Sequence, residues 1–329
     1  KPLYEYEELL GSASSNYEFP EFDEDLMATM GYTTGTTGLP KGVYFTHRQN
    51  VLHTLGVCIM LGSYLRVSHY DTVLHVVPMY HVHSWGLPYA ATLTGMKQVY
   101  PGVFDPKIFL ELVKREKVTF TGMVFTVLDM ILKHPDFEKY KEYLKGLKVA
   151  VGGAPFPRAL CERVRGIGID AIAAYGLTET CPWLTLAFLK RNLLNLPEDA
   201  KIDKYIKTGL PIPLVNLRVV NEEGKDIKKD GKEMGEIVVR APWLTKEYYK
   251  DPQRTAELWA GGWMHTGDIA TMDEDGYIKI VDRAKDVVKS GGEWISTITL
   301  EDLLLRHPAA SEVAVIGVPH EKWGERSVA

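Results

Sequence analysis

Residues 33–42 read Thr33-Thr34-Gly35-Thr36-Thr37-Gly38-Leu39-Pro40-Lys41-Gly42, directly after an apolar run, Met27–Thr33, that is typical of a buried strand. Glycines let a backbone turn tightly and present its N–H groups, and threonine hydroxyls add further donors. Lys41 adds a positive charge. A plain surface turn rarely combines four threonines with interleaved glycines and a closing Pro-Lys-Gly. The stretch therefore predicts a loop that binds the phosphates of a nucleotide.

This loop differs from the P-loop of many nucleotide hydrolases in two respects. Lys41 is followed by Gly42, where a P-loop has the serine or threonine that binds magnesium. The next residues, Val43–Thr46, have the pattern of a strand, whereas a P-loop opens a helix. The sequence therefore predicts a phosphate loop that belongs to another fold.

Around the loop, from Asp25 to about Ala174, short apolar runs alternate with amphipathic segments such as Pro106–Lys117 and Pro157–Arg165. Buried strands separated by helices predict an α/β fold with a doubly wound, mostly parallel sheet. Ligands of such sheets bind at the carboxyl ends of the strands, so site residues are expected just after these runs. The strand-like runs are Met27–Thr33, Thr72–Val77, Gln98–Tyr100, Val118–Thr121, Leu147–Val151 and Asp170–Ala174.

The pattern changes after about Thr208, where turn residues separate strand-like runs and helices are few. This favours an antiparallel, β-barrel-like subdomain with strands at Asn216–Asn221, Met234–Arg240 and Gly276–Val281. Beyond it, a strand edge at Asp286–Lys289, a helix near Thr297–Arg306 and a strand within Glu312–Pro319 predict the start of a small α+β domain. The expected units are a nucleotide-binding α/β core at 1–207, the barrel-like subdomain at 208–282 and an incomplete C-terminal lid domain at 283–329.

Composition excludes several classes of protein. The chain has 329 residues, of which 45% are hydrophobic, enough for more than one core. Its net charge of -5 and the lack of a basic stripe argue against a nucleic-acid partner. The most apolar stretch, Leu52–Leu65, contains His53 and two glycines and is too short for a transmembrane segment. The distant cysteines, Cys58, Cys161 and Cys181, favour a reducing, cytoplasmic location.

Further motifs follow the loop in a fixed order, and together they resemble the adenylate-forming superfamily of acyl-CoA synthetases, firefly luciferase and nonribosomal peptide adenylation domains. The stretches at 77–82 and 290–296 are most similar to long- and medium-chain fatty acyl-CoA synthetases. The resemblance covers most of the chain and implies truncation at both ends, because the lysine near the end of the family's C-terminal domain is missing. The matching motifs are Val151-Gly152-Gly153-Ala154-Pro155, Tyr175-Gly176-Leu177-Thr178-Glu179, His265-Thr266-Gly267-Asp268 and Asp282-Arg283-Ala284-Lys285-Asp286.

The resemblance implies a nucleotide site. In it, Tyr175 stacks on adenine, Asp268 and Arg283 bind the ribose, and Glu179 holds Mg²⁺ with the help of Thr33. An acidic side chain beside phosphates needs such a cation on electrostatic grounds. The other implied nucleotide contacts are Gly152, Gly153, Ala154, Gly176, Thr178 and the loop residues Thr34, Gly35, Thr36, Thr37, Gly38 and Lys41.

The resemblance also implies an acyl pocket, with His81 near the α-phosphate and the acyl carboxylate and with Trp85 as a gate. Gly122 and Phe125 lie where relatives have a Gly-Val-Pro-Thr-like stretch. The loss of the proline leaves the chain-length preference open, because Met123 and Phe125 have the bulk to shorten or reshape the tunnel. A zinc site at His81 and His83, expected on one face of a strand, is disfavoured because no cysteine or carboxylate has supporting spacing.

At the start of the C-terminal domain, the resemblance implies a hinge at Lys285 between two half-reactions. Lys289, Gly291, Gly292 and Trp294 then face the coenzyme A half-reaction.

The expected reaction is the ATP-dependent activation of a fatty acid, followed by thioester formation with coenzyme A. A carboxylate oxygen attacks the α-phosphorus of ATP and expels pyrophosphate, and a thiol then displaces AMP from the acyl-adenylate. Both first reactants are anionic, so Mg²⁺, Lys41, the loop amides and His81 are expected to neutralise charge and align the attack. Glu179 acts through the metal, and Lys289 is expected to serve the second step.

Other functions stay open. An amino-acid adenylation domain needs an aspartate near Tyr80 and His81 for the substrate ammonium, and Met79–Trp85 contains no acid. An aryl-CoA ligase or a luciferase-like enzyme fits the same motifs. A non-catalytic AMP-binding module is disfavoured by the retention of Lys41, Glu179, Asp268 and Arg283, and the oligomeric state is open, with a homodimer as one possibility.

Overall fold

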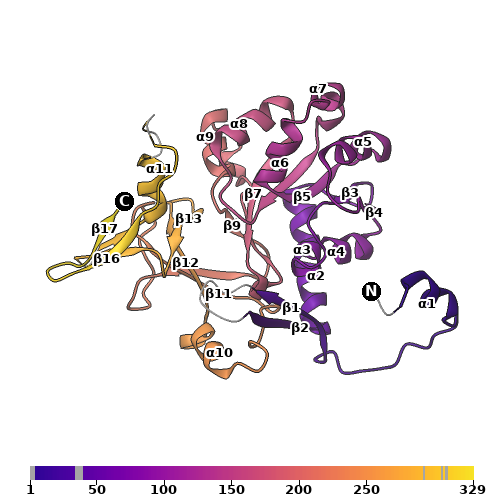
Figure 1. Ribbon diagram of the computed structural model, residues 1–329, viewed down its shortest axis with the longest axis horizontal. Coiled ribbons are helices and arrows are strands. Elements are labelled where there is room, and N and C mark those ends of the chain that lie inside the picture. The colour runs from indigo at the N-terminus through magenta and orange to yellow at the C-terminus, as the bar shows by residue number, and fades with distance from the viewer. Residues whose placement is uncertain (1–3, 34–39, 292, 305–306, 308–309) are drawn as a thin grey trace.

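The computed structural model describes residues 4–33, 40–291, 293–304, 307 and 310–329. Its largest element is a seven-stranded sheet with the strand order β4-β3-β5-β6-β7-β8-β9 (Figure 1). The strands from β4 to β7 run parallel, and β8 and β9 continue the sheet in antiparallel pairing. Their bounds are β3 Thr72–His75, β4 Lys97–Val99, β5 Phe120–Val124, β6 Lys148–Gly152, β7 Asp170–Gly176, β8 Trp183–Leu186 and β9 Leu210–Pro211.

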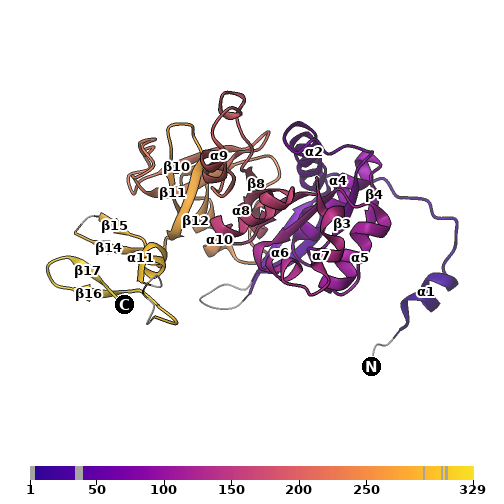
Figure 2. The same ribbon diagram turned by 90° about the horizontal axis from the view of Figure 1, so that it is seen from above.

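Helices cover both faces of this sheet, which confirms the doubly wound α/β prediction (Figure 2). The helices α2 (His47–Tyr64) and α4 (Leu87–Thr94) lie on one face. The helices α5 (Pro106–Glu116), α6 (Phe125–Leu132) and α8 (Arg158–Ile167) lie on the other. Smaller helices complete this part of the chain: α7 (Phe137–Tyr140), α9 (Glu198–Tyr205) and the 3-10 turns η1 (Lys141–Leu144), η2 (Thr178–Thr180) and η3 (Arg191–Leu193).

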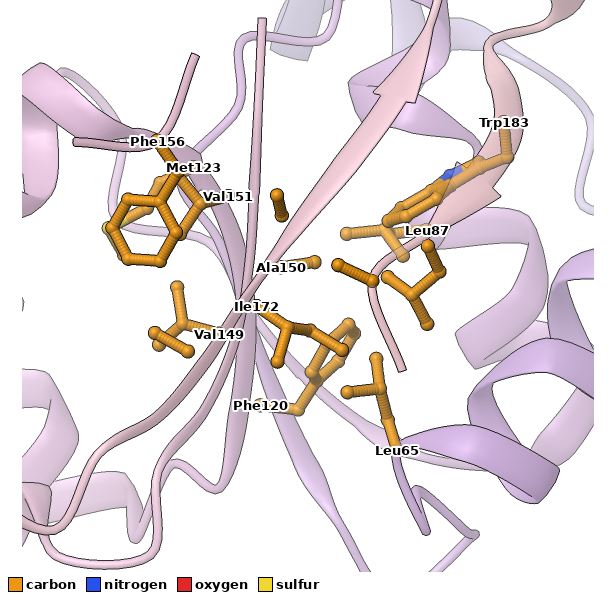
Figure 3. Close-up of a cluster of buried hydrophobic side chains, with 14 of the residues drawn as sticks. Leu65, Leu87, Phe120, Met123, Val149, Ala150, Val151, Phe156, Ile172 and Trp183 are labelled. Atoms are coloured by element: carbon orange, nitrogen blue, oxygen red, sulfur yellow. The ribbon is translucent and has the colours of Figure 1, made fainter. Parts of the chain in front are cut away.

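The central strands are mostly apolar because both their faces are covered. Val149, Ala150 and Val151 on β6 are fully buried, and Figure 3 shows Val149 and Val151 on one side of the sheet and Ala150 on the other. The side of Ala150 also holds Leu87, Phe120 and Trp183, and the opposite side holds Met123 and Phe156 (Figure 3). This two-sided core fixes the register of the strands, because a shift by one residue would exchange the two faces.

The strand order contains a switch point between β3 and β5. The chain leaves β3 through α4 to reach β4 at the edge, then returns through α5 to β5 on the other side of β3. The connection that leaves β3 runs through α4 on one face, whereas the connection that leaves β5 runs through α6 on the other, which is the geometry of a switch point. The residues that follow β3, β5, β6 and β7 therefore share one edge of the sheet.

The stretch that contains the phosphate loop does not belong to this sheet, so the prediction that Met27–Thr33 is one of its parallel strands is wrong. Met27–Thr33 is β1, and it pairs antiparallel with β2 (Lys41–Thr46) in a separate two-stranded sheet. The prediction of a strand after the loop is confirmed. Thr33 and Lys41 are register partners, because a short loop joins antiparallel neighbours whereas parallel strands need a long crossover. The residues between them, Thr34 to Leu39, lie outside the described part of the chain.

The second part of the chain forms a four-stranded antiparallel sheet with the order β10-β11-β12-β13. Its antiparallel character is confirmed, and β10 and β13 are its edges among the described residues. The strand β12, which carries the His265–Asp268 motif, was not predicted because Gly267 and polar residues break its apolar alternation. The bounds are β10 Asn216–Val220, β11 Gly235–Arg240, β12 Met264–Met272 and β13 Ile278–Arg283, with α10 (Pro252–Leu258) and η4 (Ala260–Gly262) between β11 and β12.

The segment between β11 and α10 packs the antiparallel sheet against the parallel one. Trp243 is fully buried, and a Cβ added to Gly56 of α2 would lie 2.9 Å from the Trp243 ring. Gln49 donates to the Leu244 carbonyl at 2.5 Å, Thr245 donates to the Tyr44 carbonyl at 3.0 Å, and the Tyr249 amide donates to the Gly42 carbonyl at 2.8 Å. The segment therefore contacts α2 and the β1–β2 hairpin at the same time.

The C-terminal part confirms the expected small α+β unit, which lies beside β13 and away from the parallel sheet (Figure 1). Its sheet has the order β15-β14-β17-β16, and the last strand along the chain, β17, was not predicted. The carboxylate of Asp282 accepts hydrogen bonds from the Thr297 amide at 2.6 Å and the Thr297 hydroxyl at 2.9 Å, which joins α11 to β13. The elements are β14 Val288–Ser290, β15 Glu293–Ile295, α11 Thr297–Leu304, β16 Ile316–His320 and β17 Gly324–Val328.

At the other end, α1 (Tyr6–Ser12) buries none of its residues and stands away from the body on an extended arm (Figures 1 and 2). Within the described ranges, no helix combines the length and the apolar character that crossing a bilayer requires.

Gly209 holds the parallel and antiparallel sheets together and carries the first prediction. Its backbone exchanges hydrogen bonds with Ile278 at 3.3 and 3.0 Å, its φ is +101°, and an added Cβ would lie 2.3 Å from the Leu186 backbone. We expect Gly209→Ala to lower the free energy of unfolding by at least about 2 kcal/mol more than Gly168→Ala. Gly168 is a matched control, because its φ is +97° and the nearest atom to its added Cβ would be in the Lys145 side chain at 3.4 Å, an ordinary contact distance. Equal losses in urea denaturation would contradict the close contact.

Candidate active site

A cavity of about 570 Å³ lies at the carboxyl ends of β6 and β7, between the parallel sheet and β13. This volume is typical of a small-molecule site. The cavity brings together six of the predicted nucleotide contacts: Gly153, Ala154, Tyr175, Gly176, Asp268 and Arg283. Its wall also includes residues that the sequence did not single out, among them Lys207, Thr208, Lys279 and Ile298.

Three of these residues form one hydrogen-bonded network. The Tyr175 hydroxyl donates to Asp268 Oδ2 at 2.6 Å, and Arg283 pairs with Asp268 Oδ1 at 2.8 Å. Asp268 and Arg283 are register partners on β12 and β13, whereas Tyr175 comes from β7 of the other sheet. The network therefore depends on the packing of the two sheets, and it leaves the Tyr175 ring on the wall of the cavity.

Burial of the network shifts its proton affinities. Asp268 is almost fully buried, and burial raises its pKa above the usual value, while the Arg283 charge and the Tyr175 hydrogen bond act in the opposite direction. Burial also raises the pKa of the Tyr175 hydroxyl well above its usual value, and Asp268 adds to that increase. Tyr175 is therefore a hydrogen-bond donor at neutral pH, and Arg283 opposes the cost of ionising Asp268 in this enclosed position.

A second, smaller cavity of about 60 Å³ adjoins the first and shares Gly153, Tyr175 and Gly176 with it. The Trp85 ring lies across its wall. A Cβ added to Gly122 would lie 3.1 Å from this ring, and one added to Gly152 would lie 3.0 Å from it. The absent side chains at Gly122 of β5 and Gly152 of β6 thus make room for the indole beside the smaller cavity.

The backbone that carries Trp85 has an unusual conformation, and the expected placement of His81 and His83 on one face of a strand is wrong. Residues Val82–Trp85 form α3, a single turn with positive φ at each residue, from 44° at Val82 to 59° at Trp85. The turn is held by the Ser84 hydroxyl, which donates to the Val77 carbonyl at 2.7 Å. Trp183 Nε1 also donates to the Trp85 carbonyl, at 2.6 Å.

His81, which directly precedes this turn, lies outside the larger cavity. The His81 side chain is exposed and lies against Tyr80 with the two rings tilted and their centroids 4.7 Å apart, and His81 lines neither of the two cavities. Phe125, the other expected pocket residue, is the first residue of α6 and is half-buried against the core. The structure thus brings Trp85 and Gly122 together and leaves His81 and Phe125 at the margin.

Lys41 and Glu179 meet around a third residue, Tyr248, that sequence reasoning missed. The Tyr248 hydroxyl donates to Glu179 Oε1 at 2.7 Å, and Lys41 Nζ lies 3.5 Å from the same hydroxyl. Burial and the neighbouring Glu179 raise the pKa of Tyr248, so its hydroxyl keeps its proton. Tyr248 lies in a charged, irregular stretch before Pro252, which carries no sequence signal for a site. In the structure, Tyr248 forms an isolated β-bridge with Val43 of the hairpin.

Several other predicted residues lie in the same region or outside it. Thr33 ends β1 beside Lys41, and Thr178 lies in η2, next to Glu179, where its carbonyl accepts the Cys181 amide. The predicted loop residues Thr34, Gly35, Thr36, Thr37 and Gly38 lie outside the described residues, as does Gly292.

The predicted hinge and coenzyme A residues lie on the C-terminal unit. Lys285 is 3.7 Å from Asp286, and Lys289 pairs with Glu222 of the turn after β10 and lies 5.2 Å from the Trp294 ring centroid. Gly291 has a φ of +61°, and an added Cβ would lie 2.8 Å from Trp323. In this arrangement Lys289, Gly291 and Trp294 line neither of the two cavities.

Comparison with known proteins identifies the class to which this fold and site belong. Residues 1–249 match the AMP-binding enzyme family, and residues 299–329 match the C-terminal domain of AMP-binding enzymes. The chain belongs to the AMP-binding enzyme family.

Particular relatives are CoA ligases. The chain is 47% identical to a long-chain-fatty-acid–CoA ligase of Thermus thermophilus over 98% of its own length and 59% of the relative's. It is 39% identical to a medium-chain-fatty-acid–CoA ligase of Ectopseudomonas oleovorans, over the same shares of each chain. The chain thus spans somewhat more than half the length of these relatives.

Solved structures agree with this placement. A fatty acyl CoA synthetase of Mycobacterium tuberculosis matches with a TM-score of 0.76 and 30% identity, over 98% of this chain and 60% of that one. An o-succinylbenzoate CoA synthetase of Bacillus subtilis, solved in complex with an acyl-adenylate intermediate, matches with a TM-score of 0.80 and 28% identity, over 98% and 62%.

The Asp268 network makes a pH prediction for AMP binding. A ribose hydroxyl donates best to an ionised carboxylate, so AMP affinity is expected to fall as the pH drops through the pKa of Asp268. Arg283 lowers that pKa, so Arg283→Gln is expected to move the loss of affinity to higher pH. Calorimetry with AMP from about pH 8 to about pH 5 measures the midpoint.

The control for this experiment is Lys279→Gln, which removes a charge from the wall of the same cavity without touching Asp268. An unshifted midpoint in Arg283→Gln, or an equal shift in both variants, would contradict the assignment of the titrating group to Asp268.

Proposed function

We propose that the full-length protein activates a fatty acid as an acyl-adenylate and transfers the acyl group to coenzyme A, as a long- or medium-chain fatty acyl-CoA synthetase. The observation that carries this proposal is the junction of two cavities around Tyr175. One cavity offers a carboxylate, a guanidinium and an aromatic ring suited to a nucleoside, and the other is walled by glycines and tryptophans. The family and its CoA-ligase relatives support the same reaction.

In the first step, a nucleoside in the larger cavity would stack its base on Tyr175 and donate its ribose hydroxyls to Asp268. Lys41, at the start of β2, would neutralise phosphate charge beside the hairpin. An uncharged acyl chain is proposed to enter beside Trp85, because the described lining of the small cavity contains no acidic side chain. We therefore propose that the carboxylate approaches the α-phosphorus from the Trp85 side and that pyrophosphate leaves toward the hairpin.

Magnesium fits the donors present. Glu179 offers a carboxylate that forms no ion pair with a described residue, and Mg²⁺ is typically held by one or two carboxylates together with substrate phosphates. When bound, the ion would supply positive charge to the phosphates. Glu179 is proposed to hold the ion together with the hydroxyl of Thr33, which is the register partner of Lys41 in the hairpin. No three His, Cys, Asp or Glu side chains converge on one point in the described ranges. Substrate phosphates and water are proposed to complete the coordination.

The second step requires the C-terminal unit to move, because Lys289, Gly291 and Trp294 are away from both cavities. We propose that Lys285 is the hinge and that the chain divides into a core at 1–207, a subdomain at 208–282 and a lid at 283–329. The Lys289–Glu222 ion pair would then break when the lid turns. A cytoplasmic location is proposed because the three distant cysteines favour a reducing compartment.

An aryl-CoA ligase or a luciferase-like adenylating enzyme is the second candidate. The specific observation in its favour is the small volume of the cavity beside Trp85, about 60 Å³, which is closer to a ring than to a long chain. Pyrophosphate release by the full-length enzyme, measured over aryl acids and straight-chain acids of increasing length, separates the two candidates.

The proposed role of Glu179 gives a direct test. Glu179→Ala in the full-length enzyme is expected to reduce pyrophosphate release by about 100-fold or more while the melting temperature stays within about 4 °C. The matched control is Glu223→Ala, which removes a carboxylate from an exposed turn where it pairs with Lys225. Normal adenylation by Glu179→Ala would remove the metal assignment.

The proposed gate gives a second test. Trp85→Ala removes the ring that fills the space between Gly122 and Gly152, so longer or bulkier carboxylates are expected to gain relative to short ones. The ratio of kcat/KM between a long and a short acid should change by about 10-fold or more, while the KM for ATP changes by less than about threefold. A collapse of ATP binding with unchanged selectivity would exclude the gate.

A further inference from the structure

Tyr248 occupies the space between the two charged residues that the proposed reaction needs at the phosphates. Its hydroxyl donates to Glu179 Oε1 at 2.7 Å, and Lys41 Nζ lies 3.5 Å from that hydroxyl and 4.6 Å from the centre of the ring. Only 5% of Tyr248 is exposed, so these contacts are made in an enclosed position. Glu179 itself is half-buried, so water can reach its carboxylate if the Tyr248 hydroxyl is removed.

The backbone around Tyr248 holds this hydroxyl in place. Tyr248 forms a β-bridge with Val43 of β2, and the Tyr249 amide donates to the Gly42 carbonyl at 2.8 Å. The Tyr248 amide donates to the Thr255 hydroxyl at 3.0 Å. On the other side, the Thr245 amide donates to the Glu179 carbonyl at 2.9 Å. The segment therefore fixes both the donor and the backbone of the acceptor.

A tyrosine hydroxyl differs from a lysine or arginine as a partner of Glu179, because it carries no charge. Its single hydrogen bond orients one oxygen of the carboxylate and leaves the negative charge and the second oxygen free to bind a cation. A cationic partner would neutralise the carboxylate and compete with a metal ion for it. The tyrosine also separates Lys41 from Glu179, and neither of them forms an ion pair with a described residue.

The geometry points to Tyr248 as a positioning residue that orients Glu179 for a divalent cation and keeps Lys41 free for the phosphates of ATP. This inference rests on the proposed function, in which Glu179 and Lys41 serve the polyphosphate. Hydrogen-bond partners of metal-binding side chains typically change metal affinity by about 10- to 100-fold when they are removed. Tyr248 would act only through Glu179 and Lys41, so it would not contribute to the binding of AMP in the absence of a metal.

The test is Tyr248→Phe in the full-length protein, which removes only the hydroxyl. The binding of Mn²⁺ in the presence of ATP, followed by electron paramagnetic resonance, is expected to weaken by about 10-fold or more. AMP affinity without metal and the melting temperature should stay near those of the unmodified protein. The matched control is Tyr44→Phe, because the Tyr44 hydroxyl donates to Glu247 at 2.8 Å in the same region but away from Glu179.

Each outcome decides between roles. Unchanged Mn²⁺ binding in Tyr248→Phe, or an equal loss in Tyr44→Phe, overturns the inference. A fall in melting temperature of more than about 5 °C together with lost AMP binding also overturns it, in favour of a purely structural role. The proposed function fails separately, if the unmodified full-length protein releases no pyrophosphate with any carboxylate, because Mn²⁺ binding does not depend on that reaction.

Discussion

The packing of Trp243 against α2 is the contact on which the arrangement of the site depends. The indole is fully buried and lies against Gly56, where any larger residue would displace it. Because Trp243 belongs to the segment that follows β11, this contact sets the distance between the antiparallel sheet and the parallel one. A buried indole of this kind contributes several kcal/mol through the apolar surface it removes from water. The larger cavity lies between the two sheets that this contact holds together.

The two polar networks of the site both cross that boundary. Tyr175 of the parallel sheet meets Asp268 and Arg283 of the antiparallel sheet, and Glu179 after β7 meets Tyr248 of the connecting segment. In each case a tyrosine hydroxyl donates to a carboxylate. A neutral donor leaves the carboxylate charge in place, so the same device suits a carboxylate that receives ribose hydroxyls and one that faces a cation. Both networks thus join the two sheets through groups that a nucleotide would contact, with Arg283 balancing the charge of Asp268 and no described cation paired with Glu179.

The sequence predicted the parts of the fold whose signal is local. The helices near Pro106 and Pro157 and the strand that leads to Tyr175 have the periodicity of their elements, so they were predicted to within a few residues. The hairpin was assigned to the wrong sheet, because an apolar run shows that a strand is buried but not which strand it pairs with. The strand β12 was missed because Gly267 and Asp268 interrupt the apolar pattern. Tyr248 could not be found, since its role depends on a contact with Glu179 across 69 positions of the chain.

The left-handed turn at Val82–Trp85 changes how substitutions in this stretch should be interpreted. Non-glycine residues in this conformation cost roughly 1–2 kcal/mol each, so the turn exists only because its surroundings supply that energy. Glycine or asparagine, which weaken an ordinary helix, would relax the backbone here, whereas alanine, the strongest helix former, would gain nothing. Sequence variation among related proteins at His83 and Ser84 therefore reports on backbone strain, and the usual scales of helix preference would rank such variants in the wrong order.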